Sequence, residues 1–234
     1  MLILALDTTT RAGSVALLRS DALGGDAVLY EQSGDPALTH GQRLPGDLIE
    51  ACAVAGVQIS DVELFAVAAG PGSFTGLRIG IATMQGLAMA RSGRIVPVST
   101  LEAIAVAAPP GPARIAAWMD AQRGEVFAQV FERGDGRARP LSEAIAARPS
   151  DALEHHREWV SGAGFEGDGA VRYRADIERG LGDVRVAAVV PHLAIAIARI
   201  AGGSPDRAVL PHAVIPIYVR KPDAEIARDR RAGA

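Results

Sequence analysis

Apolar residues in the first hundred positions fall into short runs and helical stripes that predict an α/β order. Three short apolar runs, bounded by polar residues or glycine, are typical of strands. They are residues 2–6, 13–19 and 27–32. Two segments with helical spacing follow, and after each comes an apolar run typical of a buried parallel strand. These helix–strand pairs are residues 41–56 with 62–68 and residues 77–91 with 95–98.

A proline-rich hexapeptide divides the chain. Residues 107–112 read AAPPGP, and three prolines with a glycine favour a junction between two units. Beyond it the pattern predicts a strand pair, three helices, and a last strand or extended segment. These elements are residues 113–120, 125–131, 150–156, 170–181, 193–200 and 214–219. The polar residues of the predicted hairpin, Asp120, Arg123 and Glu125, fit turn chemistry and a surface ion pair.

Composition narrows the class of protein. The 234 residues are 49% apolar and 22% charged, as in globular proteins. A formal net charge of −3 gives no basic field for gripping a nucleic-acid backbone unaided. No apolar run reaches the ~20 residues that span a bilayer, and Asp7 interrupts the first run. We therefore expect no signal peptide, no membrane contact and a cytoplasmic location.

Rare residue types exclude several kinds of chemistry. The one cysteine, Cys52, rules out an intrachain disulfide and any cysteine-rich metal site. The one lysine, Lys221, follows no glycine-rich loop, which excludes a P-loop lysine in its usual context. The histidines form no HxxxH pair and no serine lies in GxSxG, so the sequence predicts no metal site and no catalytic residues. The histidines are His40, His155, His156, His192 and His212.

The sequence DTTT, at the end of the first predicted strand, has two interpretations. Asp7 can orient a metal-bound water while Thr8, Thr9 and Thr10 face a nucleotide phosphate. Alternatively, Asp7 and Thr10 satisfy backbone groups of a turn. A phosphate turn prefers a glycine for close backbone approach, and the first one is Gly13. We therefore favour the second interpretation and regard these residues as a vestigial phosphate turn.

The segment GPGSFTGLRIG, residues 70–80, opens the second predicted helix. Its start is typical either of an anion-binding helix N-terminus or of a strand-to-helix turn capped by Ser73 or Thr75. Gly76 and Gly80 are four residues apart and share one helix face. Small residues there favour close approach by another helix, which indicates a packing surface and not catalysis.

The first predicted helix carries one largely apolar stripe, which includes His40, Leu44 and Leu48. The stripe is expected to cover the protein's own sheet. Both helices are, however, poor in large side chains. The same two helices of another chain can therefore pair with them in a four-helix interface.

Taken together, several segments resemble one protein family. In order they are ILALDTTT, the His40 region, AAGPGSFTGLRIGIATMQGLA, DAQRGEVFAQVF and IPIYVR, and they strongly resemble the TsaB (YeaZ) family of the threonylcarbamoyladenosine (t6A) tRNA-modification system. The likeness covers the whole chain, although residues 135–195 are only generically similar. Two departures are Gly41, where the family often has serine, and the extended SDALGGDAVLY segment.

The resemblance implies a two-lobed α/β fold of the sugar kinase/heat-shock ATPase/actin superfamily, with mixed sheets flanked by helices. The expected lobes are residues 1–108 and 109–213, with residues 214–234 packing back on the first lobe. Family members are non-catalytic paralogues of the catalytic subunit TsaD. They bind TsaD and, with it, TsaE, and they self-associate when alone. The resemblance therefore implies no cofactor in the isolated chain, ATP or ADP and metal in the partner subunits, and indirect contact with tRNA.

The same resemblance places a partner interface on the two helices and on the loop before the second. Its expected residues are His40, Leu44, Leu48, Phe74, Thr75, Gly76, Arg78, Gly80, Ile81 and Met84. Arg78→Glu, or a bulky residue at Gly80, is then expected to weaken partner binding and to leave the fold intact. An autonomous ATP-dependent kinase or ATPase of the same superfamily is the alternative, supported by residues 7–10. A glycoprotease-like metallopeptidase is a weaker one, since the sequence has no histidine pair.

Overall fold

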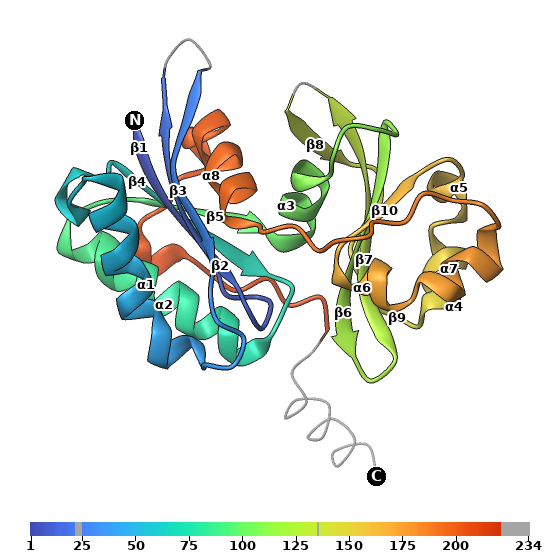
Figure 1. Cartoon of the computed structure of the whole chain (residues 1–234). Helices are drawn as coiled ribbons and strands as arrows, with labels where there is room; N and C mark the ends of the chain where they lie inside the picture. The colour runs from blue at the N-terminus through green and yellow to red at the C-terminus, as the bar shows by residue number, and fades with distance from the viewer. Residues whose placement is uncertain (22–24, 135, 221–234) are drawn as a thin grey trace.

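A computed structural model of the chain describes residues 1–21, 25–134 and 136–220. Two lobes, each built on a five-stranded sheet, lie side by side (Figure 1). Two parts of the predicted segments lie outside the described residues. They are residues 221–234 of the C-terminal segment, which include Lys221, and residues 22–24 of the SDALGGDAVLY segment. No described helix is long and apolar enough to cross a membrane.

The first sheet has the strand order β3-β2-β1-β4-β5. Its strands are β1 Leu2–Asp7, β2 Ser14–Ser20, β3 Asp26–Ser33, β4 Leu64–Gly70 and β5 Ile95–Ser99. Strand β1 lies at the centre, antiparallel to β2 and parallel to β4, and all six of its residues are buried. A strand covered on both faces must be apolar throughout, which explains the unbroken run before Asp7.

Helices cover both faces of the first sheet. Helices α1 (His40–Ala55) and α2 (Phe74–Ala90) lie on one face, and α8 (Ala194–Gly203) packs against β1 and β2 on the other (Figure 1). Helix α1 begins with a capping box between Thr39 and Gln42. The Ser73 hydroxyl accepts a hydrogen bond from the Gly76 N–H, so α2 has one of its two predicted caps.

The second sheet has the order β10-β6-β7-β8, and β9 also pairs with β7. Its strands are β6 Arg114–Gln122, β7 Glu125–Gly134, β8 Arg137–Pro140, β9 Ile145–Ala147 and β10 Gly164–Glu166. Four short helices cover its outer face around Trp118 and Phe165. They are α4 Pro149–His155, α5 Arg157–Val160, α6 Asp168–Arg172 and α7 Arg174–Leu181. The described 3-10 turns are η1 Ile59–Asp61, η2 Pro205–Arg207 and η3 Pro211–Ala213.

Helix α3 (Thr100–Ala107) and α8 lie between the lobes and join them. One continuous apolar cluster runs from Ile3 on β1 through Leu101 and Ile197 of these helices to Ile115 on β6. The predicted range of the second lobe, 109–213, therefore includes a helix that packs on the first sheet.

The predicted fold class is confirmed, with local differences. The expected helix over 170–181 is divided into α6 and α7. Of the two alternatives for residues 214–219, the strand does not form. Sequence reasoning missed helices α3 and α5 and strands β8, β9 and β10. The three strands have at most four residues each, too few for a clear alternation.

Candidate partner-binding face and interlobe cleft

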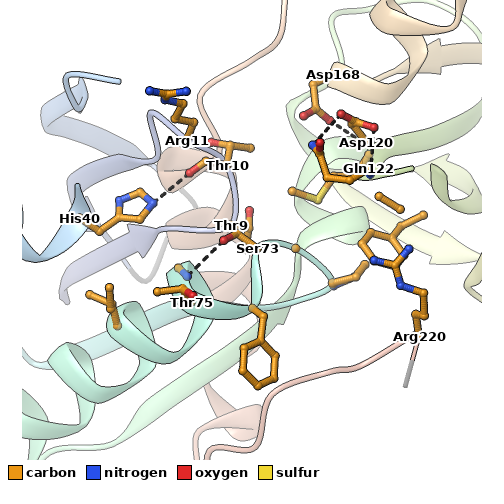
Figure 2. Close-up of a pocket in the computed structure, with 18 of the residues that line it drawn as sticks. Thr9, Thr10, Arg11, His40, Ser73, Thr75, Asp120, Gln122, Asp168 and Arg220 are labelled. Carbon is orange, nitrogen blue, oxygen red and sulfur yellow. Dashed lines mark hydrogen bonds between the residues drawn. The ribbon is translucent and has the colours of Figure 1, made fainter. Parts of the chain in front are cut away.

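A cavity of about 900 Å³ lies between the two lobes. The first lobe supplies Thr9, Thr10 and the start of α2, and the second supplies Asp120 and Asp168 (Figure 2). Residues 217–220 form a further part of its wall. The segments that sequence reasoning singled out at residues 7–10 and 70–76 therefore meet at one side of this cleft.

The DTTT segment is a closed, hydrogen-bonded turn. Asp7 is only 1% exposed, and its Oδ1 accepts hydrogen bonds from the Thr9 N–H (2.8 Å) and the Thr9 hydroxyl (2.6 Å). The Thr10 hydroxyl accepts from the Gly13 N–H at 3.1 Å. These hydrogen bonds are of the kind that the turn interpretation expects. Burial raises the pKa of Asp7, and the nearby Asp168 carboxylate also raises it, against the lowering effect of the Thr9 hydrogen bonds.

This buried carboxyl predicts a pH dependence that Asp7→Asn should remove. Below the ordinary pKa of 3.8 the carboxyl is protonated in both folded and unfolded chains. As the pH rises above 3.8, the unfolded chain releases this proton first, so the group's contribution to stability falls. Asparagine keeps the Oδ1 acceptor and carries no charge. We expect Asp7→Asn to gain stability relative to the wild type between pH 4 and pH 7.

Urea unfolding of both proteins across that range measures the difference. Glu31→Gln, at an exposed position on β3, is the control and should run parallel to the wild type. A constant difference between Asp7→Asn and the wild type across the range contradicts the prediction.

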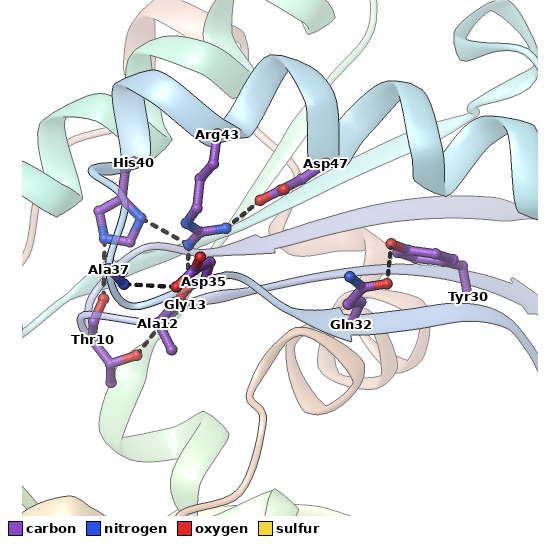
Figure 3. A network of polar contacts seen from close by, with 10 residues as sticks. All are labelled: Thr10, Ala12, Gly13, Tyr30, Gln32, Asp35, Ala37, His40, Arg43 and Asp47. Atoms are coloured by element: carbon purple, nitrogen blue, oxygen red, sulfur yellow. Dashed lines mark hydrogen bonds and ion pairs between the residues drawn. The ribbon is translucent and has the colours of Figure 1, made fainter.

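A buried arginine ties α1 to the turn after β1 (Figure 3). The Arg43 side chain is 3% exposed, and it donates to the Ala12 carbonyl and to Asp47. It also donates to Nδ1 of His40 at 2.9 Å, which leaves Nε2–H to donate to the Thr10 carbonyl at 3.0 Å. Burial, and then the Arg43 cation, lower the pKa of His40. His40 is therefore a neutral link between α1 and the cleft.

Sequence reasoning missed the role of Arg43. The available signal was an arginine three residues after His40 and four before Asp47, a spacing that places all three on one side of a helix.

The predicted interface residues divide into buried and exposed groups. Leu44, Leu48, Ile81 and Met84 are at most 9% exposed and pack in the core beneath the two helices. Their side chains pack inside the lobe and are not accessible to a partner. Phe74 is 41% exposed at the start of α2. Thr75 and Arg78 are exposed beside Phe74, and His40 is half-buried.

Gly76 and Gly80 do not face outward. A Cβ at Gly76 would collide with the Thr8 carbonyl oxygen, and one at Gly80 would collide with the Thr8 hydroxyl. These glycines let α2 lie directly on the end of β1. The expectation that a bulky residue at Gly80 leaves the fold intact is therefore wrong.

Other glycines on the two helices do face outward. In the described part of the chain, no atom lies within 4 Å of a Cβ built at Gly46 on α1 or Gly86 on α2. Glycine inside a helix costs about 1 kcal/mol relative to alanine, and no contact with the described residues requires glycine at these positions. We define the outward face as the exposed residues Gly46, Ile49, Ala82, Gly86 and Met89. Its helix backbones are open to close approach from outside.

The chain has two lobes, and each contains a mixed sheet flanked by helices. This arrangement, with the strand order β3-β2-β1-β4-β5 in the first sheet, defines the sugar kinase/heat-shock ATPase/actin-like class. A family model described as TsaD, tRNA N6-adenosine threonylcarbamoyltransferase, matches residues 36–163. The chain is 32% identical to the TsaB protein of Escherichia coli over 164 residues, which are 69% of this chain and 68% of that protein. It belongs to the TsaB (YeaZ) family.

Two further comparisons agree with this assignment. The tRNA threonylcarbamoyladenosine biosynthesis protein TsaB of Haemophilus influenzae is 37% identical over 131 residues, which span 55% of this chain and 53% of that protein. The solved structure of YeaZ from Pseudomonas aeruginosa superposes with a TM-score of 0.77 at 31% identity. That match covers 93% of this chain and 99% of the other.

The phosphate interpretation of DTTT requires space for a phosphate against this turn, and the turn does not fit one. The Thr9 carbonyl accepts from the Ser73 N–H at 3.0 Å, which joins the turn directly to the start of α2. A Cβ at Gly72 would lie 2.5 Å from the Thr9 Cβ, so phosphates have no space between these segments. The Asp7 Oδ1 is occupied by Thr9. No step of phosphoryl transfer follows from these residues.

Proposed function

We propose that this chain is a cytoplasmic, non-catalytic scaffold subunit in the synthesis of t6A on tRNA. In this proposal it binds and activates TsaD and, together with TsaD, binds TsaE. The observation that carries the proposal is the outward face, with two unexplained helix glycines, in a member of the TsaB family. The E. coli and H. influenzae relatives are both named as t6A biosynthesis proteins.

The shape of the outward face favours a helical partner. Gly46, Ala82 and Gly86 carry little or no side chain, while Ile49 (71% exposed) and Met89 (67% exposed) offer apolar contact area. A partner helix can therefore lie close to both backbones and bury these two side chains. The same geometry suits a second copy of the chain, so a homodimer is proposed for the isolated protein.

The proposal assigns catalysis to the partner. Within the described residues, no three His, Cys, Asp or Glu side chains gather closely enough to hold a metal ion, and the Asp7 carboxyl is buried against Thr9. ATP or ADP, metal and most of the contact with tRNA are therefore proposed to belong to the partner subunits. The chain's net charge of −3 agrees with an indirect role at the tRNA.

Two measurements test the proposed function. Size-exclusion chromatography with TsaD of the same organism should show co-elution at low and moderate salt, and a t6A assay should lose activity when this chain is omitted. Failure of both would overturn the proposal. Calorimetry with ATP and magnesium separates it from an autonomous kinase, for which tight binding by the isolated chain is expected.

A further inference from the structure

We propose that residues 217–220 form a strap that couples the angle between the lobes to the exposed start of α2. The strap reaches the first lobe at one end and the second lobe at the other. It lies in the last described part of the chain, which passes from the α2 side toward β6 and β7 (Figure 1). This coupling is a property of the chain alone and goes beyond the proposed scaffold function.

The first attachment is to the first lobe. The Ile217 N–H donates to the Ala69 carbonyl at the end of β4, at 2.7 Å. A Cβ at Gly70 would lie 2.5 Å from the Ile217 carbonyl oxygen, so the strap touches the strand backbone there. Gly70 also has φ +117°, a conformation that side chains disfavour. The strap is therefore held against a site that only glycine fits.

The next residue of the strap stacks on the start of α2. The Tyr218 and Phe74 ring centroids are 5.7 Å apart, with an interplanar angle of 29°. The Arg78 guanidinium lies 3.9 Å from the Phe74 centroid. Stacked rings and cation–π contacts both stabilise such an arrangement at partly exposed sites. Both rings are about two-fifths exposed, so a molecule bound at the start of α2 would meet this stack.

The far end of the strap is attached to the second lobe. The Arg220 guanidinium donates to the Glu125 carboxylate on β7 at 2.8 Å, and both side chains are about 30% exposed. It also lies 5.8 Å from the Phe127 centroid. Val219 packs against the apolar cluster that both lobes share. The strap thus spans the cavity between the lobes and forms part of its wall.

The strap is too short to let its two ends move independently. Three residue steps span at most roughly 10 Å when fully extended. With Ile217 fixed on β4, Arg220 can reach Glu125 only over a narrow range of lobe angles. The lobes are also joined at α3 and α8, whose described residues do not line the cavity that the strap spans. Rotation about that junction therefore changes the distance that the strap must span.

By thermodynamic linkage this coupling acts in both directions. A molecule that holds Phe74 against Tyr218 should favour lobe angles at which Arg220 meets Glu125. Loosening the Glu125 end should in turn loosen the Tyr218 end. The second effect is measurable in the isolated chain, so its result does not depend on whether the chain binds TsaD.

The test combines a distance measurement with amide exchange. In a Cys52→Ser background, spin labels at the exposed positions Glu31 and Glu158 report the distance between the lobes. Glu125→Gln should broaden this distance distribution. It should also raise the hydrogen-exchange rate of the Ile217 amide, at the other end of the strap, at least about 5-fold.

Matched variants make the result specific. Glu132→Gln, which breaks the exposed Arg139 pair on the same strand, should change neither readout. The double variant Glu125→Arg with Arg220→Glu exchanges the two charges. It should restore the wild-type distance distribution and the wild-type exchange rate at Ile217. An unchanged distance distribution in Glu125→Gln overturns the proposal. So does a broadened distribution without faster exchange at Ile217, because the two ends would then be uncoupled.

Discussion

Replacing Gly86 with tryptophan is expected to weaken binding to TsaD by roughly 100-fold, because overpacking a close contact costs up to about 3 kcal/mol. Gly86 lies on the outward face, and no described atom is within 4 Å of a Cβ at this position. The new ring therefore meets no neighbouring segment in the free monomer. Helix propensity also favours tryptophan over glycine, so the melting temperature should be unchanged or slightly raised at a concentration at which the wild type is monomeric. Calorimetric titration with TsaD measures the affinity, and thermal unfolding measures the stability.

A matched control separates the interface from a general effect of surface tryptophan. Gly203, at the end of α8, is also exposed and has no described neighbour within 4 Å of a Cβ. Gly203→Trp should bind TsaD as the wild type does. If Gly86→Trp binds equally well, the outward face is not the TsaD interface. Sedimentation of the same variants tests the proposed homodimer, which should dissociate in Gly86→Trp and persist in Gly203→Trp.

Periodicity predicted most of the first lobe, because its strands and helices are long and bury one kind of face each. The unbroken apolar run before Asp7 is a central strand, and the helical stripe with Leu44 and Leu48 covers the neighbouring strands β2 and β3. Helix α3 was missed because its eight residues directly precede the proline-rich junction. Strand β10 has three residues, and it is defined by pairing with β6 and by a bridge between Phe165 and Val186.

The expected interface residues came from the resemblance, which names positions along a helix and not the side to which each one points. They therefore include Leu48, Ile81 and Met84, which lie on the side that the chain itself buries. The outward face is marked instead by glycines that have no packing reason, and only coordinates separate Gly86 from Gly80. The strap was beyond sequence reasoning for another reason. Its Ile217–Ala69 hydrogen bond joins residues far apart in the chain, and no local pattern specifies such a pair.

Gly80→Leu is expected to destabilise the fold by about 3 kcal/mol or more, although it changes one small residue in the middle of a helix. Gly80 is buried, and a Cβ there would collide with the Thr8 hydroxyl. That hydroxyl donates to the Gly76 carbonyl at 2.8 Å. Leucine must therefore push α2 away from β1 and break a buried hydrogen bond at the same time.

Gly86→Leu, on the outward face of the same helix, is the comparison that isolates this cause. Its side chain has open space, so its stability should stay within about 0.5 kcal/mol of the wild type or rise slightly. Urea unfolding of the two variants measures the difference, and values within 1 kcal/mol of each other would show that α2 does not rest on Thr8 as described. Weak TsaD binding by Gly80→Leu would then reflect a damaged lobe. The interface is tested by Gly86, where the added atoms can meet only a partner.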